Sequence, residues 1–240
     1  MPRFTTPRED AIIFHIDMDV MKERMSMFYL PAQVRVQADS ATVLKQILRR
    51  IEQHGAERFT DIDVLQQRMA QHRELLDKVA QRDSQSISRS SPANTIDLHQ
   101  VLTALRQRLP ENNLVLNESI SNYPAVWMNL APTRPGSLIT SGGSSLGWAL
   151  GAAIGAALAG KANPKYAKDL ITVIVGDGTY IFGIPSASFW MARRYDTAAG
   201  GAWWKQVKET SEAVAAIEEG IDMVCSQRRC AVIEVVLPKF

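Results

Sequence analysis

The apolar run LITVIV, residues 170–175, passes directly into Gly176, Asp177 and Gly178. An unbroken apolar and β-branched run of this length is typical of a strand that is buried on both faces. Other short apolar runs occur along the chain, and segments with the apolar spacing of a helix separate them. Strands that alternate with helices predict an α/β fold, with a parallel sheet flanked by helices. The predicted strands are 11–16, 114–117, 137–140, 170–175, 202–207 and 231–236.

The chain divides into three parts by its composition. Residues 1–81 combine one strand-like run with two helical stripes, and we expect them to form a fragment of an α/β domain. Residues 82–92 contain five serines and end in proline, a composition typical of a linker. Residues 93–240 form the larger predicted α/β domain. The predicted helices are 39–55, 61–81, 94–108, 122–131, 146–160, 185–195 and 210–226.

Composition excludes several classes of protein. The 27 Lys and Arg residues nearly balance the 25 Asp and Glu residues, so we expect no nucleic-acid partner bound through excess basic charge. The most apolar stretch, 146–160, is shorter than the ~20 residues of a membrane-spanning helix, so we expect no membrane segment. The first twenty residues carry no secretory pattern, and Cys225 and Cys230 are expected to be reduced thiols. These features favour a cytoplasmic protein.

Three predicted strands end in segments rich in glycine or polar residues. The first of these segments is NESISNY, after 114–117; the second is SGGSS, after 137–140; the third is GDG, after 170–175. Ligands of open α/β sheets bind at the carboxyl ends of strands, and helix starts there suit phosphate. A carboxylate such as Asp177 suits Mg²⁺ shared with a diphosphate. The combination predicts a metal–diphosphate site, although each segment alone is also typical of an ordinary cap or turn.

Other motif-like segments lack the rest of a site. Residues 155–162 resemble a P-loop, but Ala162 stands where Ser or Thr would hold the metal. His15, Asp17 and Asp19 share one face of a predicted strand, and we interpret them as solvated polar residues. The remaining histidines, on predicted helices without a nucleophile pattern, are His54, His72 and His99.

Three segments carry a resemblance to a known family: NESISNY, SGGSSLGWALGAAIGAALA and VGDGTYIFGIPSASFWMARRYDT. Together they resemble the thiamine diphosphate-dependent decarboxylase and carboligase family, which includes acetolactate synthase, benzoylformate decarboxylase and benzaldehyde lyase. They cover nearly all of residues 92–197. Residues 12–47 resemble the end of the family's middle domain, and FHIDMD matches a strand that in some members lies near an adenine nucleotide. The resemblance implies the C-terminal domain of a 2-oxo acid decarboxylase or carboligase, a lyase or transferase, that binds thiamine diphosphate and Mg²⁺.

The resemblance also implies roles for individual residues at the diphosphate. Asp177 matches the acidic Mg²⁺ ligand, and Gly178 and Thr179 match residues that touch the diphosphate. Ser121, together with the backbone of Ile120, matches the group that holds the diphosphate from the other side.

The loop before the Ala/Gly-rich helix matches the part of the family site that holds the rest of the cofactor. Leu146 matches the apolar residue that wedges beneath the cofactor and bends its two rings into a V. The backbone carbonyl of Ser144 would accept a hydrogen bond from the aminopyrimidine amine, and Ser145 belongs to the same cofactor-binding loop.

The sequence departs from the family at two points. Family members place an Asn-Asn pair, which includes the second metal ligand, roughly two dozen residues after GDG. Here residues 202–206 read AWWKQ, and no Asn follows Asn163. We infer an internal deletion near 197–199 that removes a strand, this ligand and the loop that covers the diphosphate. The family's catalytic Glu comes from the N-terminal domain of a partner subunit, and no residue of this chain, Glu118 included, matches it.

These departures shape the expected function. Binding of thiamine diphosphate and Mg²⁺ by this chain alone is expected to be weak or lost, and the chain is not expected to be catalytically competent alone. One interpretation is an enzyme subunit in a homo- or hetero-oligomer with a chain that supplies the N-terminal pyrimidine-binding domain. The alternatives are a non-catalytic truncated paralogue or interaction protein that pairs with full-length relatives, and a misjoined gene product.

Overall fold

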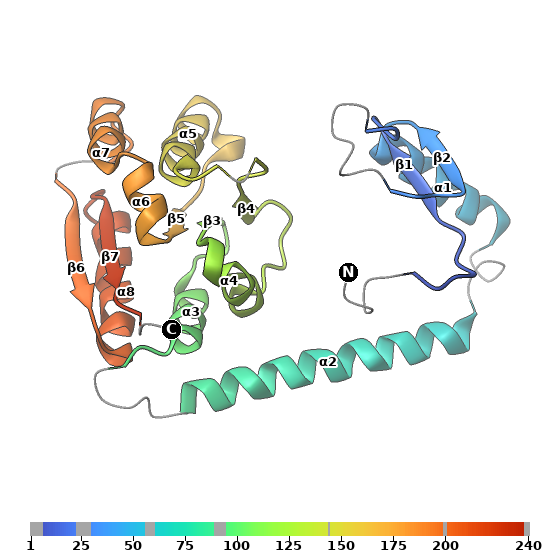
Figure 1. The fold of residues 1–240 in the computed structure, drawn as a ribbon, viewed down its shortest axis with the longest axis horizontal. Coiled ribbons are helices and arrows are strands. Elements are labelled where there is room, and N and C mark those ends of the chain that lie inside the picture. The colour runs from blue at the N-terminus through green and yellow to red at the C-terminus, as the bar shows by residue number, and fades with distance from the viewer. Residues whose placement is uncertain are drawn as a thin grey trace. The chain divides into compact units, whose positions relative to one another are not determined.

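The computed structural model describes residues 7–22, 30–55, 61–88, 95–143, 145–198 and 201–237. The chain forms two compact units, residues 1–76 and 77–240, and each is described by itself (Figure 1). The domain bounds expected from the sequence, 1–81 and 93–240, remain a prediction.

Among the described residues of the first unit, a two-stranded parallel sheet is followed by a helix. β1 (Phe14–Asp17) pairs with β2 (Val34–Gln37), and α1 (Ser40–His54) comes next. Asp39 caps α1 because its carboxylate accepts a hydrogen bond from the backbone N–H of Thr42, at 2.8 Å. The helical stripe of α1 is visible in the sequence, yet none of its residues is buried.

The polar residues at the end of β1 form a local ion pair. Lys22 Nζ lies 2.6 Å from Asp17 Oδ2. This hydrogen bond, assisted by one from the backbone of Asp19, lowers the pKa of Asp17 to about 2. His15 Nε2 lies 3.7 Å from the same carboxylate oxygen. The Lys22 ammonium therefore stabilises the charged form of the Asp17 carboxylate.

The next helix, α2 (Ile62–Ser88), continues past the predicted helix end at residue 81. The predicted helix end is therefore wrong by seven residues, because residues 82–88 are helical, whereas the linker predicted over 82–92 stays a prediction. Serine weakens a helix only modestly, and no Gly or Pro interrupts the sequence between Ile62 and Pro92. The remainder of the predicted linker, 89–92, lies outside the described residues.

Within the residues that the structure describes, the second unit contains two separate parallel sheets (Figure 1). The strands are β3 (Asn113–Glu118), β4 (Leu138–Thr140), β5 (Leu170–Val175), β6 (Trp203–Val207) and β7 (Ala231–Val235). The first sheet has the order β4-β3-β5, and the second consists of β6 and β7. Within the described residues, β5 and β7 each pair along one edge only.

Helices cover both faces of the first sheet. The α-helices of this unit are α3 (Leu98–Arg108), α4 (Tyr123–Leu130), α5 (Trp148–Ala162), α6 (Asp177–Phe182), α7 (Pro185–Arg194) and α8 (Thr210–Cys225). Two short 3-10 helices are η4 (Ile120–Asn122) and η5 (Pro164–Tyr166). Leu114 and Leu116 of β3 pack against α5, whereas Val115 packs against α3 and α4. Burial on both faces explains why β3 is apolar without alternation.

The second sheet has a core of its own. Val207 of β6 and Ile217 of α8 are buried with Val101 of α3. The neighbouring residue of α3, Leu102, belongs instead to the core of the first sheet. Successive helical residues point roughly 100° apart, so one helix serves both cores. α3 thereby joins the two sheets into one unit.

The α/β class predicted from the sequence is confirmed, because strands alternate with helices and the strands of every sheet are parallel. β5 has the predicted bounds, whereas β2 is a strand that the sequence pattern did not indicate. The second unit holds two sheets where the sequence suggested one. Among the described residues, no helix combines the length and apolar content needed to cross a lipid bilayer.

Candidate functional site

The carboxyl ends of β3, β4 and β5 meet at one edge of the first sheet. The register pairs Asn117 with Thr140 and Glu118 with Val175, so all three strands end at the same level. The three polar segments singled out in the sequence therefore leave the sheet side by side. We call this edge, with the described residues 117–121, 141–143, 145–147 and 176–179, the polar edge.

Two polar side chains at the end of β3 are buried at the polar edge. Asn117 is 0% exposed, and its Oδ1 accepts hydrogen bonds from the backbone N–H and hydroxyl of Ser119, at 3.1 and 2.7 Å. Its Nδ2 is buried without a hydrogen-bond partner in the part of the chain that the structure describes. Buried amide donors are rarely left without an acceptor. Asn117 therefore fixes the turn after β3 and keeps one donor for another group.

The residues after this turn are exposed, and the backbone of one of them is strained. Ile120 has a φ of 28°, a left-handed conformation that a β-branched residue rarely adopts. Its side chain is 54% exposed, and Ser121 is exposed as well. Strained backbone of this kind concentrates at functional sites. The structure thus places Ile120 and Ser121 at the surface of the polar edge, and their contact with a diphosphate stays a prediction.

The loop before α5 contributes open backbone and one apolar side chain. A Cβ added at Gly142 or Gly143 would meet no atom within 4 Å. Ser145 is exposed, and Leu146 is 39% exposed rather than buried in a core. The predicted wedge residue is thus available to a ligand, although its role remains a prediction. Ser144, predicted to accept a hydrogen bond from the cofactor, lies outside the described residues.

Asp177 begins α6 directly after β5. It is exposed, and its Oδ1 accepts a hydrogen bond from the backbone N–H of Gly178, at 2.8 Å. A Cβ at Gly176 or Gly178 would meet no atom within 4 Å, so the backbone beside Asp177 is open. Thr179 is only 4% exposed, so its side chain faces the interior. The predicted roles of Asp177, Gly178 and Thr179 stay predictions.

The segment where the family pattern would place a second metal ligand belongs to the other sheet. β6 pairs with β7, and Lys205 Nζ lies 2.9 Å from Glu219 of α8. Gln206 donates to Glu234 at 3.0 Å. No group of three or more His, Cys, Asp and Glu side chains within the described residues could hold a metal ion. Asp177 is the one carboxylate of the polar edge that is exposed.

Glu118 is a site residue that sequence reasoning left without a role. Its carboxylate is 2% exposed and accepts hydrogen bonds from two backbone N–H groups, those of Trp148 at 3.2 Å and Ala149 at 2.9 Å. It therefore caps the start of α5 from a strand thirty residues earlier. The signal in the sequence was indirect: a Glu ends an apolar strand, and α5 begins after Gly147, which has no capping side chain.

The polar edge fits a diphosphate and fits a metal ion in part. An unpaired Asn117 donor, four glycines facing open space and the exposed Ser121 and Ser145 hydroxyls suit an anion. Asp177 supplies a single carboxylate for a hard cation such as Mg²⁺, which prefers six oxygen ligands. A bound diphosphate and water would have to complete the coordination.

Comparison with known proteins finds a family model that matches part of the chain. Residues 119–199 match the family described as thiamine pyrophosphate enzyme, C-terminal TPP binding domain. One similar solved structure is a candidate thiamin diphosphate-dependent enzyme from Mycobacterium smegmatis, with 18% identity, a TM-score of 0.49 and coverage of 60% of this chain and 32% of that one. Another is benzoylformate decarboxylase from Polynucleobacter necessarius, with 15% identity, a TM-score of 0.43 and coverage of 59% and 33%. The chain spans about a third of each. No curated protein sequence matches it.

Proposed function

We propose that the polar edge binds the diphosphate of thiamine diphosphate together with Mg²⁺, because residues 119–199 match the C-terminal TPP-binding domain of thiamine pyrophosphate enzymes. The observation that carries the proposal is that three strands end at the same place. β4 and β5 lie within the matched region, and β3 ends directly before it. They bring Asp177, four open glycines and exposed hydroxyls to one edge of a parallel sheet.

The residues of the polar edge divide the work of binding. Asp177 would ligate Mg²⁺, and the open backbone at Gly178 would approach the phosphate oxygens. Ser121 and the backbone of Ile120 would hold the diphosphate from the end of β3. Leu146 and the loop residues Ser144 and Ser145 would contact the rings. When bound, the cofactor supplies the carbanion chemistry of 2-oxo acid decarboxylation or carboligation.

We propose further that this chain needs a partner for catalysis. A Mg²⁺ ion at Asp177 would find no second protein ligand in the segment where the family pattern places one, because residues 203–207 form β6 in the other sheet. The acidic group that would activate the aminopyrimidine has no counterpart in the sequence. A chain with a pyrimidine-binding domain would supply this group in a homo- or hetero-oligomer, as in acetolactate synthase-like lyases and transferases.

The second candidate is a non-catalytic paralogue that pairs with full-length relatives. The observation that favours it is the divided sheet, since β5 and β7 each have one edge without a strand partner among the described residues. Open strand edges favour association with another chain. A decarboxylation assay on pyruvate and benzoylformate, with the partner present, separates the candidates. Activity that disappears in Asp177→Ala supports the enzyme, and absence of activity supports the paralogue.

Isothermal titration with thiamine diphosphate and Mg²⁺ tests the cofactor site. We expect binding weaker than micromolar that depends on Mg²⁺, and we expect Asp177→Ala to remove it because a hard cation loses its carboxylate. Asp169→Ala is the matched control, since Asp169 is an exposed aspartate just before the amino end of the same strand, β5. Micromolar or tighter binding would contradict the inference that an internal deletion has removed a metal ligand and the loop over the diphosphate. Equal binding by the wild type and Asp177→Ala would remove Asp177 from the site.

A further inference from the structure

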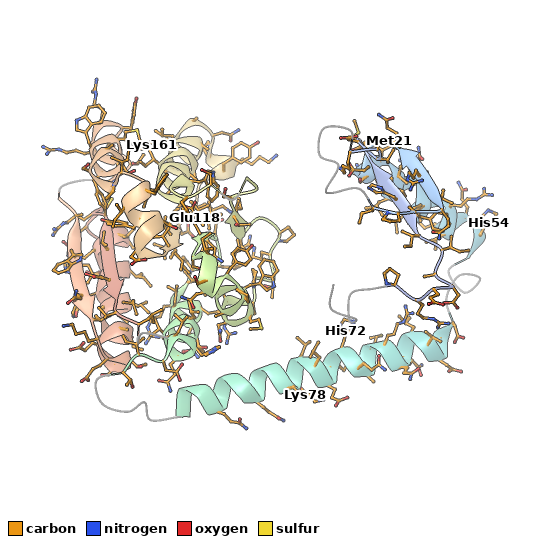
Figure 2. The ribbon with its side chains drawn as sticks, in the orientation of Figure 1. Met21, His54, His72, Lys78, Glu118 and Lys161 are labelled. Carbon is orange, nitrogen blue, oxygen red and sulfur yellow. The ribbon has the colours of Figure 1, made fainter. Side chains whose placement is uncertain are left out.

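We propose that Glu118 is a positioning residue that holds the three segments of the polar edge in place through the first turn of α5. This inference rests on the proposed function, because the segments that it holds are those proposed to bind the diphosphate. Figure 2 labels Glu118 at the end of β3, inside the second unit.

The first link joins β3 to α5. The first backbone N–H groups of a helix have no acceptor within the helix. The residue before α5 is Gly147, which has no side chain to cap this end. Glu118 fills that role with both of its carboxylate oxygens, one for Trp148 and one for Ala149. The positive end of the helix dipole also favours a carboxylate at this place.

Because Glu118 is buried, breaking this link would cost free energy. The side chain is 2% exposed, and no Lys, Arg or His among the described residues forms an ion pair with it. A buried carboxylate is costly unless hydrogen bonds compensate for lost water. Here the two backbone N–H groups of α5 are those donors. Separating α5 from β3 would leave both the carboxylate and the helix end without partners.

The second link joins α5 to α6. Gly147 has a φ of +93°, and a Cβ there would lie 2.9 Å from the backbone of Phe182 and Gly183. In return, a Cβ at Gly183 would lie 2.9 Å from Leu150 of α5. The start of α5 and the end of α6 therefore touch backbone to backbone. α6 is a six-residue helix, so a shift at this contact is passed to Asp177 at its other end.

The consequence concerns all three segments of the polar edge. Ile120 and Ser121 follow Glu118 by two and three residues, Leu146 precedes Trp148 by two, and Asp177 begins the helix that Gly147 touches. Loosening the bond between Glu118 and α5 would separate these segments from one another. A diphosphate that contacts several of them would then bind less tightly.

Hydrogen exchange of backbone amides, followed with and without ligand, tests the inference. Glu118→Gln keeps the size of the side chain but turns an NH₂ donor toward a backbone N–H. Glu118→Asp, shorter by one methylene, is a milder second variant. The control is Asp97→Ala, because Asp97 caps α3 in the same way by accepting from the N–H groups of His99 and Gln100, at 2.9 and 3.2 Å.

Without ligand, we expect Glu118→Gln to raise the rate of amide exchange at Trp148 and Ala149 about tenfold. Smaller increases in rate are expected over 141–147 and 177–183. The amides of β6, β7 and α8 should not change. Asp97→Ala should speed exchange at the start of α3 and leave the polar edge as it is. Unchanged exchange at Trp148 and Ala149, or an equal increase throughout the second unit, would overturn the positioning role.

With millimolar thiamine diphosphate and Mg²⁺, the wild type should show slower exchange across the polar edge. Glu118→Gln should need about tenfold more cofactor for the same protection, and Asp97→Ala should need the wild-type amount. An equal requirement in Glu118→Gln would overturn the link to the cofactor. Absence of protection in the wild type would overturn the proposed function and this link with it, while the ligand-free comparison still decides whether Glu118 holds α5.

Discussion

The two sheets of the second unit differ in how their strands end. In the first sheet, β3, β4 and β5 pass into buried polar side chains, open glycines and the exposed carboxylate of Asp177. In the second sheet, β6 passes into a capping box between Glu209 and Glu212 that starts α8, and β7 is followed by Val236 and Leu237. Both sheets are parallel and both pack on α3.

This difference distinguishes the proposed binding edge of the first sheet from the supporting second sheet. The strand ends of the second sheet use their polar groups among themselves, in caps and cross-strand bonds such as Gln206 to Glu234. The strand ends of the first sheet leave several glycine backbones open, and the buried Nδ2 of Asn117 has no hydrogen-bond partner among the described residues. A parallel sheet therefore does not create a site by itself. The residues after each strand decide whether its carboxyl end closes on itself or receives a ligand.

The largest expected effect comes from the core of the second sheet. Ile217→Ala should destabilise the protein by about 2–4 kcal/mol, because Ile217 is buried against Val207 and Val101. Since α3 packs on both sheets, we expect β3 to lose protection together with β7. Urea unfolding gives the loss of stability, and hydrogen exchange reports β3 and β7 separately. Ile181→Ala is the control, because Ile181 is 72% exposed and should change stability little. If β7 opened while β3 stayed protected, the two sheets would be independent units.

A smaller effect is expected from the contact between α5 and α6. Gly147→Ala should destabilise the protein by about 1–3 kcal/mol, because Gly147 has a φ of +93° and touches the backbone of Phe182. Gly151→Ala is the matched control, four residues later in α5, where a Cβ meets no atom within 4 Å. An exposed helical position of this kind should gain up to ~1 kcal/mol from alanine. Thermal unfolding measures both. Equal stability of the two variants would show that the α5–α6 contact does not hold the polar edge.

The sequence was sufficient to predict the elements of this edge. LITVIV is β5 as predicted, and the three strand ends that suggested a diphosphate site lie together. These features are local, since apolar runs and glycines determine the conformation of their own segment of the chain. The same is true of the helix end wrongly predicted at residue 81, because the absence of Gly and Pro allowed α2 to continue to Ser88.

The features that the sequence did not predict depend on contacts between distant residues. β2 is four exposed residues long and is defined only by its pairing with β1. The division of the sheet depends on which strands pair, and strand pairing is not encoded in any one run. Glu118 contacts α5 thirty residues away, so its role as a cap appears only in the fold. Local pattern thus gave the segments of the polar edge, and tertiary contacts show how these segments pack together.

The smallest expected effect concerns a charged link that adjoins both sheets. Asp196 follows α7 and forms ion pairs with Lys161 of α5, at 3.1 Å, and with Arg228 just before β7, at 3.5 Å. Lys161, labelled in Figure 2, lies on a helix of the first sheet, whereas Arg228 adjoins the second. The hydrogen bond and charge of Lys161, with the charge of Arg228, hold the pKa of Asp196 below its ordinary value of 3.8. The charged form of Asp196 therefore stabilises the folded state slightly.

The pH dependence of Asp196→Asn follows from the direction of this pKa shift. A carboxyl with a lowered folded pKa contributes stability above 3.8 and loses it as the pH falls through the folded value. The variant should be slightly less stable than the wild type at neutral pH, and the difference should shrink below pH 3.8 and in 1 M salt. Urea unfolding across pH measures it, and Lys161→Ala alone and combined with Asp196→Asn gives the coupling. A difference that stays constant with pH and salt would mean that the two sheets are joined through the α3 core without help from this charged link.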